Sequence, residues 1–181
     1  MLDRRTKGVA FLKRIVIVCT GNTCRSPMAE VMLRDELSRN GISQNDIKVT
    51  SAGIFAAEGE QAMPQAIEVM KERNLSLERH RSRRLTPVMI EEADLILTMT
   101  HAHKQSVLLM DAAVSDRVFS LAEYTAELAA DTRRDVPVPY GQPLDVYRKT
   151  AAHLEDKLQA VAEKLKREME GSEDNENSHR Q

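Results

Sequence analysis

The sequence contains few of the features that mark secreted, membrane-spanning or nucleic-acid-binding proteins. Its 181 residues include two cysteines and no tryptophan, and two thiols are too few for the disulfide framework of a small secreted domain. No segment approaches the roughly 20 consecutive apolar residues of a membrane-spanning helix. The net charge of -2 lacks the basic excess of nucleic-acid binders. We therefore expect a cytoplasmic protein that binds neither membranes nor nucleic acid, and the composition leaves its oligomeric state open.

The two ends of the chain differ in composition from its centre. Lys13 and Arg14 interrupt the apolar residues near the N-terminus, whereas a signal peptide needs an apolar run of about 7–15 residues. We expect residues 1–13 to form an N-terminal extension and residues 14–170 to form a single domain. Residues 171–181 are polar and rich in acidic and amide side chains, which predicts a disordered tail.

Short apolar runs alternate with helical patterns along the domain. Buried strands are predicted at 15–18, 47–49, 95–97 and 117–119. Helices are predicted between these runs and over a long final segment from Tyr147 to Met169, and a proline-containing loop is predicted over 131–145. The order predicts an α/β fold: a single three-layer domain with a central four-stranded parallel sheet and helices on both faces.

The loop after the first predicted strand carries the strongest chemical pattern. It reads V-C-T-G-N-T-C-R-S-P, and Ser26-Pro27 is a typical helix start. A loop between a buried strand and a helix N-terminus presents backbone N–H groups that bind a tetrahedral anion. That environment favours the thiolate of Cys19, and Arg25 can add a bidentate contact to the same anion. A Walker-type loop is excluded because the Gly-Lys-Ser/Thr ending is missing.

The pattern therefore predicts a phosphate loop with Cys19 as nucleophile and Arg25 as phosphate clamp. The residues expected to bind phosphate are Thr20, Gly21, Asn22, Thr23, Cys24, Arg25 and Ser26. The alternative, in which Cys19 is a buried core cysteine and Arg25 a surface residue, does not account for the spacing between a buried strand and a proline-started helix.

The stretch VCTGNTCRSPMAE resembles the signature of the low-molecular-weight protein tyrosine phosphatase family, and is most similar to its bacterial protein arginine phosphatase branch. Further similarity lies at Val49–Gly53, Ala93–His101 and Asp145–Tyr147, and in all it covers roughly Arg14 to Met169. The resemblance implies a cysteine-dependent protein phosphatase that acts on phosphorylated proteins through a phosphocysteine intermediate. It also implies that neither a metal nor another cofactor is needed.

The same resemblance assigns roles to single residues. Cys19 attacks phosphorus, Arg25 holds the equatorial oxygens, and Ser26 donates a hydrogen bond to the thiolate. The implied supporting network consists of Asn22, Ser26, Ser51 and His80. Two of these have alternatives: Ser51 as a cap of its own strand end, and His80 as a solvated side chain in the basic run 79–84, which could also steer phosphorylated substrates.

Three further residues are implicated in selectivity and redox protection. The resemblance implies that Thr23, where tyrosine-specific members carry a bulky aliphatic residue, favours phosphoarginine. Tyr140 matches an aromatic residue that flanks the substrate, and simple packing is the alternative for both residues. Cys24 matches a cysteine that forms a reversible disulfide with the nucleophile; the alternative is an inert packed thiol.

One position departs from the family pattern. The family's general acid is an aspartate before a Pro-aromatic pair, and here Val138 precedes Pro139-Tyr140. Valine cannot transfer a proton, so reduced activity is predicted, with Asp135 as a weak substitute for the general acid.

Three hypotheses for the function remain: a phosphoarginine phosphatase, a phosphotyrosine phosphatase, and an impaired module that binds phosphorylated residues. An arsenate reductase would need more cysteines than Cys19 and Cys24.

Overall fold

The computed structural model describes residues 13–126 and 135–177, with the backbone alone for 172–177. Its centre is a four-stranded parallel sheet in the order β2-β1-β3-β4. The strands are β1 (Lys13–Cys19), β2 (Ile47–Gly53), β3 (Leu95–Thr98) and β4 (Val118–Ser120). The four predicted strands and the α/β class are therefore confirmed, and Lys13 is part of β1 instead of the predicted extension.

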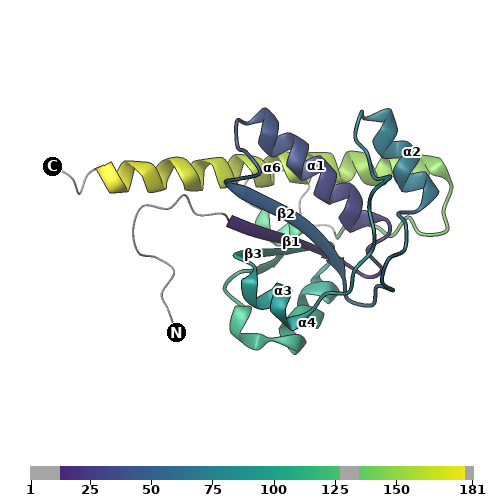
Figure 1. Ribbon diagram of the computed structural model, residues 1–181, viewed down its shortest axis with the longest axis horizontal. Helices are drawn as coiled ribbons and strands as arrows, with labels where there is room; N and C mark the ends of the chain where they lie inside the picture. Colours follow the sequence, from purple (N-terminus) through teal and green to yellow (C-terminus); the bar gives the residue numbers. More distant parts are fainter. Residues whose placement is uncertain (1–12, 127–134, 178–181) are drawn as a thin grey trace.

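Helices cover both faces of the sheet, as predicted (Figure 1). On one face lie α1 (Arg25–Arg39), α2 (Pro64–Glu72) and α6 (Leu144–Asn177), and on the other lie α3 (Pro87–Glu92) and α4 (His101–Met110). Successive side chains of β1 point to opposite faces of the sheet, so this strand contributes to two apolar clusters. Ile15 and Ile17 belong to the larger apolar cluster under α1 and α6, while Val16 and Val18 belong to the smaller cluster under α3 and α4. Burial of both sides explains the unbroken apolar composition of this strand.

Helix starts follow local hydrogen-bond chemistry. The Thr100 hydroxyl accepts from the backbone N–H of His103 and caps α4, as expected for a threonine before a helix. The helix α1 begins at Arg25, one residue earlier than the Ser26-Pro27 start that we predicted. The Ser26 side chain does not cap it because its hydroxyl is used in the phosphate loop.

Two short elements escaped the sequence analysis, namely η1 (Ala112–Val114) and α5 (Leu121–Tyr124). A capping box between Ser120 and Glu123 holds α5. Both are too short to show a hydrophobic period. Among the residues that the structure describes, no helix combines the length and the apolar composition of a membrane-spanning segment.

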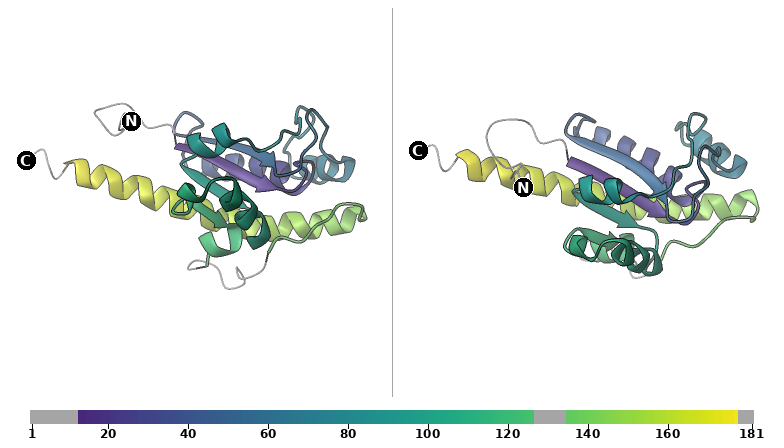
Figure 2. Two further views of the ribbon diagram at one scale, coloured as in Figure 1. Left: turned by 90° about the horizontal axis from the view of Figure 1, so that it is seen from below. Right: turned by 60° about the horizontal axis from the view of Figure 1, so that its bottom comes forward.

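The last helix is longer than predicted and extends beyond the sheet toward the C-terminus (Figures 1 and 2). It continues to Asn177, so the part of the expected disordered tail from 171 to 177 is helical. Gly171 alone does not end it, since a glycine inside a helix costs only about 1 kcal/mol. The remaining predicted tail (178–181), residues 1–12 of the extension and the first part of the predicted loop (131–134) lie outside the described residues.

Candidate active site

The phosphate loop leaves the sheet at the end of β1 and returns at the start of α1. Cys19 is the last residue of β1 and Arg25 the first of α1, so the loop lies at the carboxyl edge where ligands of such folds bind. Asn22 has a φ of 54°, the left-handed conformation that asparagine tolerates better than most residues. This turn places the backbone N–H of Asn22 3.3 Å from the Cys19 Sγ.

The Cys19 sulfur is buried and receives hydrogen bonds from the loop. Its side chain is 3% exposed, and its Sγ lies 2.9 Å from the Ser26 Oγ. The Asn22 Nδ2 donates to the same Ser26 Oγ at 2.9 Å, so the Ser26 proton is free to point at sulfur. Hydrogen-bond donors of this kind stabilise a thiolate, both as nucleophile and as leaving group.

Arg25 lies across the loop and is almost fully buried. Its Nη1 donates to the Val136 carbonyl at 3.2 Å and its Nη2 to the Thr20 Oγ1 at 3.3 Å. Burial lowers the pKa of Arg25, and the neighbouring charge of Cys19 acts in the opposite direction. The guanidinium thus contacts Thr20, the residue that follows Cys19 in the loop, and its action on a phosphate bound there stays a prediction.

The orientation of the Asn22 amide follows from its partners. The Oδ1 accepts from the Arg83 backbone N–H at 3.0 Å, which directs the Nδ2 toward Ser26 and Ser51, each at 2.9 Å. His80 donates from Nε2 to the Asn22 carbonyl at 2.7 Å, because a carbonyl can only accept. Burial lowers the pKa of His80 and favours this neutral ring.

The structure thus brings together the four residues of the predicted network. They are Asn22, Ser26, Ser51 and His80. Ser51 does not cap its own strand, and His80 is half-buried instead of solvated. Their contacts with the loop are observed, and their catalytic role stays a prediction.

Thr23 and Cys24, which the resemblance assigned to selectivity and redox protection, are both buried. Thr23 is 9% exposed, and its Oγ1 lies 3.8 Å from the Cys24 Sγ. The Cys24 Sγ lies 3.4 Å from the Tyr147 hydroxyl. Burial raises the pKa of the Cys24 thiol, so the second cysteine is held protonated. Both cysteines are free thiols here.

The loop before α6 brings one carboxylate to the site. The Asp135 Oδ1 accepts from the backbone N–H of His101 at 3.0 Å, and its charge lies close enough to Arg25 to raise the pKa of that guanidinium. Val138 and Tyr140 are 58% and 65% exposed. Tyr140 is thus not packed in the core, so the alternative of simple burial does not apply to it.

Comparison with known proteins agrees with this geometry. The family model described as low molecular weight phosphotyrosine protein phosphatase matches residues 14–171. The chain belongs to this family. The predicted family, fold and class of enzyme are therefore confirmed.

The chain is similar both to proteins named protein-arginine-phosphatase and to proteins named protein-tyrosine-phosphatase. A protein-arginine-phosphatase of Bacillus subtilis is 41% identical over 154 residues, covering 85% of this chain and 97% of the relative. The low molecular weight protein-tyrosine-phosphatase PtpB of Staphylococcus haemolyticus is 37% identical over 148 residues, covering 78% and 91%. Among solved structures, a mutant of YwlE from Bacillus subtilis has a TM-score of 0.77 at 40% identity, covering 85% of this chain and 99% of that chain. A YwlE arginine phosphatase mutant with a phosphorylated active site serine also has a TM-score of 0.77 at 40% identity, covering 84% and 95%.

The sequence analysis assigned no role in the site to His103, which contacts the phosphate loop. The Nε2 of His103 lies 2.9 Å from the Thr20 Oγ1, and its Nδ1 lies 2.8 Å from the Thr100 Oγ1. Burial, followed by the positive charge of Arg25, lowers the pKa of His103 to about 4. A neutral imidazole therefore joins the phosphate loop to the start of α4. The only sequence signal was the Thr100 cap.

Two other neighbours of the loop also went unassigned. Glu30 accepts from the Ser51 Oγ at 2.5 Å and pairs with Arg34 at 2.6 Å, which extends the network by a buried carboxylate. Phe55 is 71% exposed, and its backbone N–H donates to the Thr20 carbonyl. Its backbone is thus bonded to the loop, while its side chain is exposed.

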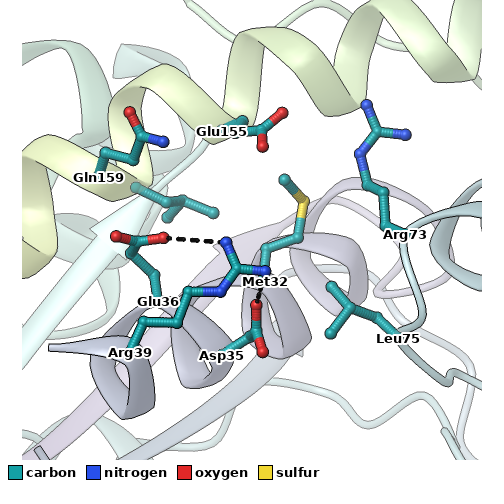
Figure 3. Close-up of a pocket in the computed structure, with 9 residues that line it drawn as sticks. Met32, Asp35, Glu36, Arg39, Arg73, Leu75, Glu155 and Gln159 are labelled. Atoms are coloured by element: carbon teal, nitrogen blue, oxygen red, sulfur yellow. Dashed lines mark ion pairs between the residues drawn. The ribbon is translucent and has the colours of Figure 1, made fainter. Parts of the chain in front are cut away.

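A separate hollow between α1, the end of α2 and α6 contains none of the predicted site residues (Figure 3). Its volume is about 130 Å³. Arg39 pairs there with Asp35 at 2.7 Å and Glu36 at 3.8 Å, and Arg73 projects from the opposite side. Arg39 is thus paired with two carboxylates of its own helix, and none of the lining residues belongs to the phosphate loop.

Proposed function

We propose that the protein removes phosphate from phosphoarginine residues of protein substrates through a phosphocysteine intermediate. The observation that carries this proposal is the convergence of the Cys19 sulfur and the Arg25 guanidinium on one loop of backbone N–H groups. The proposed partners are phosphorylated proteins. The cytoplasm is the proposed location because a thiol nucleophile needs a reducing compartment.

The first step is an in-line displacement at phosphorus. The Cys19 thiolate forms the S–P bond while the P–N bond breaks and its electron pair moves to the guanidine nitrogen. Arg25 and the loop N–H groups stabilise the charge on the three equatorial oxygens. The phosphoguanidinium group is already cationic, so the guanidine departs as a neutral species and takes its proton from water.

The second step releases the enzyme. Water attacks the phosphocysteine, the S–P bond breaks, and its electron pair returns to the Cys19 sulfur, which accepts the Ser26 hydrogen bond. The proton of the attacking water passes to solvent or to the departing phosphate. Val138 cannot accept it, so we expect this step to limit turnover.

Position 138 is valine where the family pattern has an aspartate, and this difference favours phosphoarginine over phosphotyrosine as the substrate. Phosphotyrosine releases a phenolate, whose negative charge needs a proton donor in the transition state, and general acid–base catalysis is typically worth about 10²–10⁴-fold. The guanidine leaves without a negative charge, so its departure depends less on such a donor. Thr23 at the loop wall and the similarity to proteins named protein-arginine-phosphatases support the same substrate.

Two alternatives follow from specific observations. The family description and relatives named protein-tyrosine-phosphatases favour a phosphotyrosine substrate. Val138 favours an impaired module that binds phosphorylated residues.

A comparison of kcat/KM on phosphoarginine and phosphotyrosine peptides of one sequence, with mass spectrometry of the intact protein, separates the three. We expect multiple turnovers with the higher kcat/KM on phosphoarginine. A higher value on phosphotyrosine contradicts the substrate, one stable phosphate on Cys19 indicates a stalled enzyme, and binding without phosphate transfer indicates the module.

A further inference from the structure

A basic groove is lined in part by residues that contact the phosphate loop. It has a volume of about 360 Å³ and is formed by α1 and the segment 76–83. Four of its lining residues are arginines, namely Arg34, Arg79, Arg81 and Arg83. None of these side chains takes part in the proposed reaction.

The groove has an excess of positive charge. Its one lining carboxylate, Glu30, is occupied by Arg34 at one oxygen and by the Ser51 hydroxyl at the other. Arg81 donates to the carbonyl oxygens of Glu78 and His80, which provide no compensating charge.

Arg83 and Arg79 add to this excess. Arg83 donates to the Ser51 carbonyl, and Arg79 has no hydrogen bond or ion pair with any residue that the structure describes. Three guanidinium groups around one hollow therefore lack an anion among the described residues. Each has a planar set of donors that fits the oxygens of a phosphate group.

The groove is joined to the phosphate loop through a single residue. His80 donates to the Asn22 carbonyl, and the Arg83 backbone N–H donates to the Asn22 Oδ1. Residues that line the groove thus hold the back of the loop, while the loop N–H of Asn22 points to the Cys19 sulfur. Asn22 thus contacts residues of both basic sites.

We infer that this groove is a second phosphate-binding site, distinct from the phosphate loop. Inorganic phosphate, released by the proposed reaction, and a second phosphorylated side chain of a protein substrate would present the same tetrahedral dianion. The inference does not depend on turnover, because binding can be measured in a variant without the nucleophile or the clamp.

The first test uses inorganic phosphate and a disabled phosphate loop. In Arg25→Ala, we expect phosphate, titrated against sodium chloride at matched ionic strength, to shift the His80 ring and Arg83 amide resonances in NMR spectra. The further change Arg79→Gln/Arg81→Gln should abolish these shifts. Arg73→Gln, which removes one positive charge from the hollow of Figure 3, should not change them.

Two outcomes of this titration overturn the inference. One is an absence of saturable shifts at His80 and Arg83 in Arg25→Ala. The other is the persistence of these shifts in Arg79→Gln/Arg81→Gln. Both substituted arginines are exposed on the segment, and unchanged thermal unfolding would show that the variant is folded.

The second test distinguishes the two sources of phosphate. Cys19→Ala binds phosphopeptides without turning them over, so Kd can be compared for peptides with one and with two phosphorylated residues. If the substrate fills the groove, the second phosphate should lower Kd about 5-fold or more, and Arg79→Gln/Arg81→Gln should remove this gain. If free phosphate binds while the second phosphorylated residue gives no gain, the product is the ligand.

Discussion

A Cβ atom on Gly53 would lie 2.6 Å from the carbonyl oxygen of Thr20. Gly53 is the last residue of β2 and pairs with Cys19 in the sheet register, so the phosphate loop folds over it. The same Cβ would lie 2.9 Å from the backbone nitrogen of Asn22. Both neighbours are backbone atoms of the loop and cannot rotate away, so the loop position depends on the missing side chain.

Replacing Gly53 with alanine should therefore damage catalysis more than folding. We expect Gly53→Ala to lower kcat/KM at least about 10-fold, because a displacement of about 1 Å in a catalytic geometry can have such effects. The free energy of unfolding should fall by about 1–3 kcal/mol, the usual cost of overpacking. Steady-state kinetics measure kcat/KM, and urea unfolding measures the free energy of unfolding. Gly171→Ala, at a position in α6 with open space around it, is the control. Full activity of Gly53→Ala would show that the loop tolerates displacement.

Arg25 should not be replaceable by lysine. Its two terminal nitrogens reach Val136 and Thr20 on opposite sides of the site, and the single ammonium of a lysine cannot bond both and a phosphate. We expect Arg25→Lys to lower kcat about 100- to 1000-fold, the range for loss of a preorganised oxyanion donor. Arg148→Lys, which changes an exposed pair with Glu72, should leave kcat unchanged. Similar kcat values for the two variants would contradict the assignment of Arg25.

Acid should destabilise the fold through His103. The pKa of His103 is lowered from 6.5 to about 4, so between these values the unfolded chain binds a proton that the folded chain does not. The free energy of unfolding therefore falls as pH decreases from 6.5 to 4. The pKa of His80 is lowered too and adds to the same slope. Urea unfolding between pH 7 and 4.5 measures how the free energy of unfolding changes with pH. This change should be smaller in His103→Gln than in the unsubstituted protein. Equal changes in the two proteins would mean that the His103 ring is not kept neutral.

The sequence was informative wherever the chemistry is local. The strand, the loop and the start of α1 are continuous in the chain, so the spacing of Cys19 and Arg25 already defined the centre of the site. The buried strands could be recognised because both faces of the sheet are covered.

Contacts between distant segments could not be predicted from spacing. Thr20 and His103 are 83 positions apart, and Asn22 and Arg83 are 61 apart. Their meeting depends on the pairing of β3 with β1, since α4 follows β3, and on the hydrogen bond between Arg83 and Gly53 at the end of β2. Glu30 was inside the recognised signature, but its partner Ser51 comes from β2. The resemblance supplied part of this network, and the physical pattern of residues alone did not.

Thr23 tests the assignment of substrate. Its side chain is buried at the loop wall beside Cys24, so a larger aliphatic group there must change the shape of the site. We expect Thr23→Ile to lower the ratio of kcat/KM on phosphoarginine to that on phosphotyrosine about 10-fold or more. Thr23→Ser, which keeps the hydroxyl, should largely preserve the ratio. If Thr23→Ile leaves the ratio unchanged, the selectivity argument is wrong.

Val138 tests the missing proton donor. Because it is 58% exposed and precedes Pro139, an aspartate there would be solvated and free to transfer a proton in both steps. We expect Val138→Asp to raise kcat on phosphotyrosine about 100-fold, within the range of general acid–base catalysis. The gain in kcat/KM should be smaller on phosphoarginine, since kcat/KM reports the formation of phosphocysteine, in which its leaving group departs neutral. The rate of phosphocysteine hydrolysis should rise equally for both substrates. Val138→Asn, whose side chain has the shape of aspartate but no transferable proton, is the control.

Burst kinetics should lose their slow second phase in Val138→Asp and keep it in Val138→Asn. Equal gains in Val138→Asp and Val138→Asn would indicate that shape, not proton transfer, limits the natural chain.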